Sequence, residues 1–97
     1  MMVAYHPAAR AELEAEVGYY NNERPGAGSN LRADVKETIS PLRQFPLLGR
    51  PDGDGIRRIV TQRYRFIIHY VIVGNRIVIL AVAHPSREPG YWLQRLL

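Results

Sequence analysis

The chain has 97 residues, 46% of them hydrophobic, which is enough for one small domain and leaves no room for a second core. It contains no cysteine, which excludes disulfides and thiolate metal sites and fits a reducing cytoplasm. The formal net charge of +4 is concentrated in the second half of the chain: residues 1–49 carry five basic and six acidic side chains, and residues 50–97 carry eight arginines and three acidic side chains.

Arginine supplies almost all of the positive charge, since Lys36 is the only lysine. Arginine favours bidentate contacts with phosphate or carboxylate groups. A GC-rich genome would enrich arginine as well, and the composition leaves both explanations open.

The N-terminus, Met1 to Pro7, has neither a basic region nor a long apolar run, so we expect no signal peptide. No apolar stretch reaches the roughly 18 residues of a membrane-spanning helix, because Arg76 interrupts the longest one. We therefore expect a cytoplasmic protein without a membrane partner.

The first half of the chain predicts a short strand over residues 1–5 and then two helices. Pro7 suits the first turn of a helix. Apolar residues at helical spacing follow, and the helix should stop near residue 22, before a Pro-Gly-Ala-Gly cluster, with its glutamates mostly facing solvent. Ser29 or Asn30 should cap the second helix, and Pro41 should break it near Ser40. The apolar stripes are Ala9, Leu13, Val17 and Tyr20 in the first helix, and Leu31, Val35, Ile39, Leu42 and Phe45 in the second.

The second half predicts a loop over residues 47–55 and three strands over residues 56–62, 64–73 and 76–84. Gly74-Asn75 has the length of a tight hairpin turn. The last strand is almost wholly apolar and should be buried on both faces, and residues 91–97 should form a short helical or irregular tail. The order β-α-α-β-β-β predicts an α+β fold, a single domain over residues 1–97 with a helical hairpin on a mostly antiparallel sheet.

Several arginines lie in or between the predicted strands, and a histidine, an arginine and a tyrosine lie at or just after the end of the last strand. We expect Arg63 and Arg65 to share one strand face and to form a basic binding surface with neighbouring arginines. The alternative is a solvated face whose cations prevent edge-to-edge aggregation. His84 and Tyr91 are candidate proton-transfer groups, because histidine titrates near neutrality and nearby arginines can lower a tyrosine pKa. The candidate residues are Arg57, Arg58 and Arg63 for binding, and Arg65, His84, Arg87 and Tyr91 for catalysis.

Known catalytic and metal motifs are missing from the sequence. His6, His69 and His84 are too scattered to argue for zinc, so we expect neither a metal nor a cofactor. We expect His69 to be an ordinary half-buried or surface histidine of a strand, and Trp92 to pack the tail onto the sheet.

Four short motifs follow one another along the chain: Tyr5-His6-Pro7-x-Ala, Phe45-Pro46-x-x-Gly49-Arg50, Tyr64-Arg-Phe-Ile-Ile-x-Tyr70 and Ala-Val-Ala-His84-x-x-Arg87-x-Pro89-x-Tyr91-Trp92. Together with the element order they resemble the RelE/ParE toxin superfamily of bacterial type II toxin–antitoxin modules. The resemblance implies a growth-inhibiting toxin that forms a hetero-oligomer with a cognate antitoxin.

The superfamily implies two targets. ParE-like members poison DNA gyrase, and RelE-like members cleave mRNA on the ribosome without a metal. By resemblance to the RelE-like nucleases, Arg65 matches an arginine of the nuclease site and Tyr91 matches its C-terminal tyrosine. Arg57 or Arg58 matches a basic residue of a strand, and His84 matches a position where some of these nucleases have a basic residue or a histidine. The nuclease lysines are absent here, and the helical hairpin and His84-x-x-Arg87 look more like the ParE branch. A ParE-like gyrase inhibitor is therefore the first expectation. The alternatives are a RelE-like nuclease and an inactive relative that only binds antitoxin.

Overall fold

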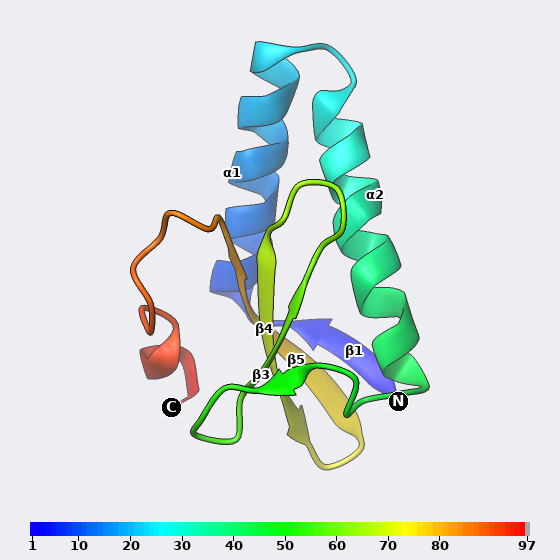
Figure 1. Cartoon of the computed structure of the whole chain (residues 1–97), viewed down its shortest axis with the longest axis vertical. Helices are drawn as coiled ribbons and strands as arrows, with labels where there is room; N and C mark the ends of the chain where they lie inside the picture. The colour runs from blue at the N-terminus through cyan, green and yellow to red at the C-terminus, as the bar shows by residue number, and fades with distance from the viewer. Residues whose placement is uncertain (97) are drawn as a thin grey trace.

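The computed structural model describes residues 1–96, in which two helices pack on a five-stranded sheet (Figure 1). The strand order is β1-β5-β4-β3-β2; β1 is parallel to β5, and the other neighbours are antiparallel. This confirms the predicted α+β class and element order. The elements are β1 (Met2–Tyr5), α1 (Pro7–Glu23), α2 (Ala27–Ile39), η1 (Ser40–Arg43), β2 (Arg50–Pro51), β3 (Arg57–Val60), β4 (Ile67–Val73), β5 (Arg76–Ala83) and η2 (Leu93–Leu96).

The helical hairpin forms where the apolar stripes predicted it. Ala9, Leu13 and Val17 of α1 are buried, and they pack with Leu31 and Val35 of α2. The predicted cap at Ser29 or Asn30 is wrong, because α2 already begins at residue 27. The turn is tighter than expected because glycine at position 26 adopts φ 87° at the N-cap, a conformation that side chains disfavour.

Pro41 ends the second helix as predicted. Helix α2 stops at Ile39, and the chain continues as the 3₁₀ turn η1 through Arg43. Proline lacks a backbone N–H and clashes with the preceding turn of an α-helix, whereas it is tolerated in the first turn of a new helical segment. Leu42 of η1 remains fully buried, so the break still contributes to the core.

The close contact between the two helices depends on Gly28. Its backbone N–H donates to Asn21 Oδ1 at 2.8 Å, and a β-carbon at this position would collide with the carbonyl oxygen of Val17 and lie 2.5 Å from Asn21 Cγ. We expect Gly28→Ala to destabilise the protein by about 2 kcal/mol, because backbone cannot yield to the added methyl group as a flexible side chain can. The measurement is urea unfolding monitored by circular dichroism.

Gly18→Ala is the matched control for this substitution. Gly18 lies in α1 with no neighbouring atom within 4 Å of the added carbon. Alanine is the better helix former, so this variant should gain about 0.5–1 kcal/mol. Equal stability of the two alanine variants would contradict the close-packing role of Gly28.

The strands are shorter than predicted. Strand β3 ends at residue 60 and β4 begins at residue 67, so residues 61–66 form a turn. Two side chains hold this turn. Asp34 of α2 accepts the backbone N–H of Arg63 at 3.2 Å from either carboxylate oxygen, and its Oδ2 accepts the N–H of Tyr64 at 2.8 Å. Thr61 Oγ1 accepts the N–H of Phe66 at 3.0 Å. One further backbone bond, from the N–H of Thr61 to the carbonyl of Phe66 at 2.9 Å, ends the pairing, and the two side chains hold the turn beyond it.

Strand β2 lies inside the segment predicted as a loop, so that prediction is wrong for two residues. They pair with β3 next to Gly49, whose N–H donates to the buried hydroxyl of Tyr70 at 2.8 Å. The same hydroxyl donates to the carbonyl of Pro46 at 2.7 Å. A tertiary contact thus orders the segment and adds a strand that the local sequence does not indicate.

Strand β5 is buried nearly throughout, as predicted, and the turn at Gly74 joins it to β4 with φ 61°. One face of the sheet packs on the helices. The other face carries a second apolar cluster, formed by Ile56, Leu80, Ala81 and Trp92. Trp92 belongs to the C-terminal tail, so this tail covers part of the second face, as predicted. Leu97, the last residue of the predicted tail, lies outside the described residues.

Among residues 1–96, no helix combines the length and the apolar character needed to cross a membrane.

Candidate functional site

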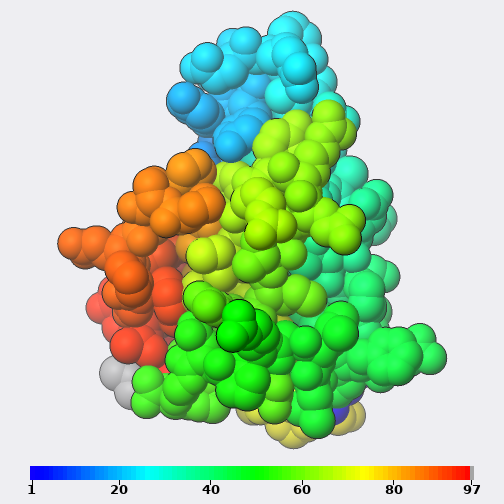
Figure 2. Space-filling model, viewed as in Figure 1, coloured from blue at the N-terminus to red at the C-terminus, as the bar shows by residue number. Residues whose placement is uncertain are grey.

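A pocket of about 350 Å³ opens on the second face of the sheet, between β3, β4 and the segment that follows β5. In Figure 2, that segment and the tail (orange and red) lie beside the green and yellow-green strand segments. The pocket contains cations, carboxylates, imidazoles and one indole. Its lining residues are Asp52, Asp54, Arg58, Ile67, His69, Ala83, His84, Pro85, Arg87, Pro89, Gly90, Trp92 and Leu93.

Only part of the expected basic surface reaches this pocket. Arg58 lies opposite His69 in the β3–β4 ladder and lines the pocket. Arg57 lies opposite Tyr70, a residue of the helix-side core, because successive strand residues face opposite sides. The Arg57 guanidinium donates to the carbonyl of Gly49 at 2.8 Å, so it holds the segment before β2. The two adjacent arginines therefore do not form one patch.

Arg63 and Arg65 do not share a strand face, contrary to the prediction. Both lie in the turn between β3 and β4, where Arg65 takes φ 63°. Arg63 lines a different pocket, next to α2, and its guanidinium lies 5.4 Å from the ring centre of Tyr64. Neither residue lines the β3–β4 pocket, which His84 and Arg87 do line.

His84 and Arg87 do meet in the pocket. His84 Nδ1 accepts the N–H of Ser86 at 3.1 Å and lies 2.7 Å from the Ser86 hydroxyl. Because Nδ1 is an acceptor, the neutral ring carries its proton on Nε2. The ring packs edge-on against Phe66 with 5.4 Å between centres. Arg87 lies 4.1 Å above the Tyr91 ring, which fixes its guanidinium at the pocket edge.

Tyr91 does not fit the expected proton-transfer role. Its hydroxyl is buried and makes no hydrogen bond of good geometry within residues 1–96. Burial raises the pKa of Tyr91 well above its usual range, and the neighbouring Glu12 carboxylate adds to this, outweighing the opposite effect of Arg87 and Arg95. The expectation that nearby arginines lower this pKa is therefore wrong, because desolvation is the larger effect.

The prediction of a half-buried or surface histidine is wrong for His69. Only 2% of its surface is exposed, and its ring stacks on Trp92 with centres 3.5 Å apart. Asp52 Oδ2 lies 3.4 Å from Nδ1, but neither ring nitrogen has a hydrogen bond of good geometry within the described chain. Burial lowers the pKa of His69 to about 4, despite the nearby Asp52 carboxylate. The only sequence signal was its position in an apolar strand.

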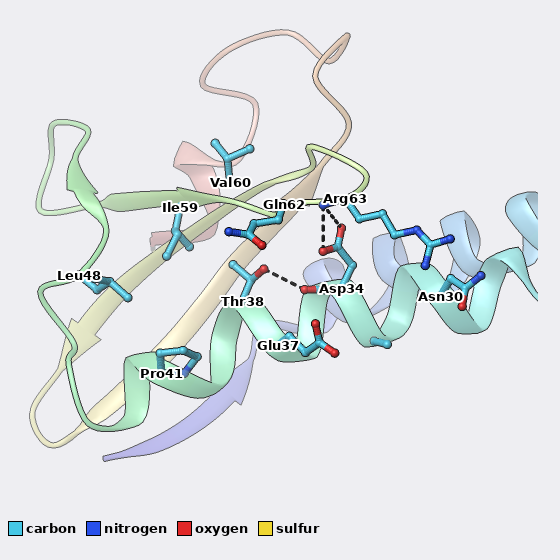
Figure 3. A pocket seen from close by; sticks show the side chains of 11 residues that line it. Asn30, Asp34, Glu37, Thr38, Pro41, Leu48, Ile59, Val60, Gln62 and Arg63 are labelled. Carbon is cyan, nitrogen blue, oxygen red and sulfur yellow. Dashed lines mark hydrogen bonds between the residues drawn. The ribbon is translucent and has the colours of Figure 1, made fainter.

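A second pocket, of about 480 Å³, lies between α2 and β3 (Figure 3). Leu48, Ile59 and Val60 line one side of it, and Ala33 of α2 and the following Pro41 line the other. The remaining lining residues are polar or charged: Asn30, Asp34, Glu37, Thr38, Gln62 and Arg63. We call this the α2–β3 groove. Exposed apolar side chains continue from it, since Phe45 and Leu47 are 57% and 65% exposed. Such a groove suits the apolar face of a partner helix.

Within residues 1–96, no three histidine or acidic side chains are grouped so that they could hold a metal ion.

Comparisons with known proteins agree with this fold. A family model described as "ParE toxin of type II toxin-antitoxin system, parDE" matches residues 3–89. A solved structure of a "Chromosomal ParDE TA system from P. aeruginosa" contains a similar chain, with a TM-score of 0.78 and 26% sequence identity. The alignment covers 87% of this chain and 95% of that one. A search of curated proteins found no match.

Proposed function

Because the chain belongs to the ParE toxin family of type II toxin–antitoxin systems, we propose that it inhibits growth by binding DNA gyrase and is neutralised by a cognate antitoxin. The family match supports the growth-inhibiting role directly. The choice of gyrase over mRNA depends on how the candidate catalytic residues are arranged.

The buried state of Tyr91 carries this choice. A nuclease with this set of residues would use Tyr91 or His84 as acid or base, within reach of a phosphate held by arginines. Here the Tyr91 hydroxyl is buried with a raised pKa, and Arg65 lies in the turn between β3 and β4 and does not line the pocket. Arg58, His84 and Arg87 remain together at the pocket, where His84 is the candidate acid or base that is left once Tyr91 is buried.

The α2–β3 groove supports the proposal of an antitoxin partner. The groove combines apolar residues (Leu48, Ile59 and Val60) with polar ones, and the exposed Phe45 and Leu47 add apolar surface, which together suit an amphipathic helix that folds on binding. Arg63 is the one cation that lines the groove among the described residues, and it would contact an acidic residue of that helix. The complex would be a hetero-oligomer in the cytoplasm.

The test is a supercoiling assay with purified DNA gyrase and the purified toxin. We expect the chain to inhibit supercoiling and the antitoxin to restore it. Tyr91→Phe and Arg65→Ala should inhibit to within about twofold of the parent chain, because neither group would take part in a binding mechanism.

Primer extension on a reporter mRNA with ribosomes is the second arm of the test. Intact mRNA is expected with each of these proteins. Ribosome-dependent cuts that disappear in Tyr91→Phe, together with unchanged supercoiling, would overturn the gyrase proposal and identify the chain as a nuclease.

A further inference from the structure

The outer edge of β1 is an unpaired edge of the sheet. Among residues 1–96, strand β1 is last in the strand order and pairs only with β5. The N–H of His6 donates to the carbonyl of Ile79 at 2.8 Å, so the backbone groups of Ala4 and His6 point toward β5. Those of Val3 and Tyr5 alternate with them and point outward, where no part of the described chain pairs with them.

A cationic pocket of about 320 Å³ borders this edge. It lies where α1 and the end of α2 approach β1, and Val3, Tyr5 and Ile39 supply its apolar lining. The pocket lining has three cations and no acidic residue. The lining residues are Val3, Tyr5, Arg10, Lys36, Ile39, Ser40 and Arg43.

The three cations of this pocket have no carboxylate partner within residues 1–96. Two other arginines, Arg32 and Arg95, do form ion pairs with glutamates of α1. The Arg10 guanidinium instead lies 4.5 Å above the Tyr5 ring, which places its charge at the edge of β1. The hydrogen bond from Arg32 is the largest cause of the lowered pKa of Glu14, and the Arg10 charge also contributes, so Glu14 lies near Arg10 but its carboxylate is bonded to Arg32. The three cations therefore keep an excess of positive charge, which attracts an anion.

We propose that the β1 edge binds an extended acidic segment of a partner protein as an additional strand of the sheet. The added strand would bond to the outward N–H and C=O groups of Val3 and Tyr5. Alternate side chains of a strand face one side of a sheet, so acidic residues two positions apart would lie over the side chains of Val3 and Tyr5. That side holds the pocket with Arg10, Lys36 and Arg43.

Two features together favour a polypeptide over a nucleic acid. The cations alone would bind any anion, including phosphate. The alternating donors and acceptors of a strand edge match only another polypeptide backbone. The lining of this edge shares no residue with the α2–β3 groove or with the β3–β4 pocket, so peptide binding at the edge and inhibition of gyrase are measured independently.

The test uses the full chain and a fluorescent ten-residue peptide in which glutamate and valine alternate, with binding followed by anisotropy at low salt. A glutamine-for-glutamate peptide should bind about tenfold more weakly, because it lacks the charge. A peptide N-methylated at alternate residues should lose binding to a similar extent, because it cannot complete the ladder. Hydrogen exchange at Val3 and Tyr5 should slow when the acidic peptide is bound.

Matched variants locate the site. Lys36→Gln and Arg43→Gln should each weaken peptide binding by about threefold or more. Arg24→Gln removes the same charge at the far end of the hairpin and should leave binding unchanged. All three side chains are exposed, so the variants should fold. Equal affinity for the glutamine peptide, equal competition by a single-stranded oligothymidylate, or unchanged exchange at Val3 and Tyr5 would overturn the proposal.

Discussion

Arg95→Ala is expected to lower the free energy of unfolding by about 3 kcal/mol, because it leaves a largely buried glutamate without its counter-charge. The Arg95 guanidinium forms two bonds to Glu12, at 2.9 and 3.1 Å, and both side chains are only 14% exposed. It also donates to the carbonyl of Leu80 at 2.8 Å. This hydrogen bonding to Glu12 raises the pKa of Arg95.

The position of this ion pair explains its expected effect. Strand β1 pairs with β5 only as far as Ile79, while β5 continues to residue 83. Beyond that point side chains bind the β5 backbone: Glu12 accepts the N–H of Val82 at 3.1 Å, and Arg95 binds the carbonyl of Leu80. The pair therefore joins α1, β5 and the tail, and its loss leaves unsatisfied both a charge and backbone groups.

Urea unfolding of Arg95→Ala and Arg32→Ala measures this effect. Arg32 of α2 forms an equally bidentate pair with Glu14, which lies in α1 as Glu12 does, but both side chains of this pair are about half exposed. Solvent screens such pairs, so the Arg32 variant should be close to the parent in stability. A double-mutant cycle with Glu12→Gln should recover part of the loss. Equal destabilisation by the two arginine substitutions would contradict a special role for the Arg95 pair.

Acid should destabilise the protein through His69 by about 3 kcal/mol between pH 6.5 and pH 4. The pKa of His69 falls from 6.5 to about 4 on folding, because burial disfavours the imidazolium. Between these values the unfolded chain binds a proton that the folded chain does not, so stability decreases as the pH decreases. Below about pH 4 both states are protonated, and this contribution levels off.

The charged groups around His69 act in both directions. Asp52 and Glu12 favour the imidazolium, whereas Arg58 across the ladder opposes it, and desolvation is the largest effect. His69→Phe keeps an aromatic ring against Trp92 and removes the titration, so it is the matched variant. Unfolding free energies measured from pH 7 to pH 4 should show a shallower decrease for His69→Phe. Parallel curves for the two proteins would show that His69 does not titrate in this window.

The candidate site could be predicted only in part. His84 and Arg87 lie three residues apart just after one strand, and the structure brings them into the same pocket as expected. The expected joint surface of Arg57 and Arg58 fails, because adjacent residues of a strand point to opposite faces. Tyr91 fails as a proton-transfer group because the fold buries its hydroxyl beside Glu12, more than seventy residues away in sequence.

The sequence by itself determined the elements whose cause is local. The 3.6-residue apolar stripes specified the helical hairpin, Pro41 specified its end, and the apolar run before His84 specified the buried strand. The tertiary structure alone decided what depends on residues far apart in the chain. Asp34 of α2 holds the turn between β3 and β4, and the burial of His69 under Trp92 lowers its pKa to about 4. Periodicity reports which face of an element is buried, but strand register and long-range packing decide which polar groups meet there.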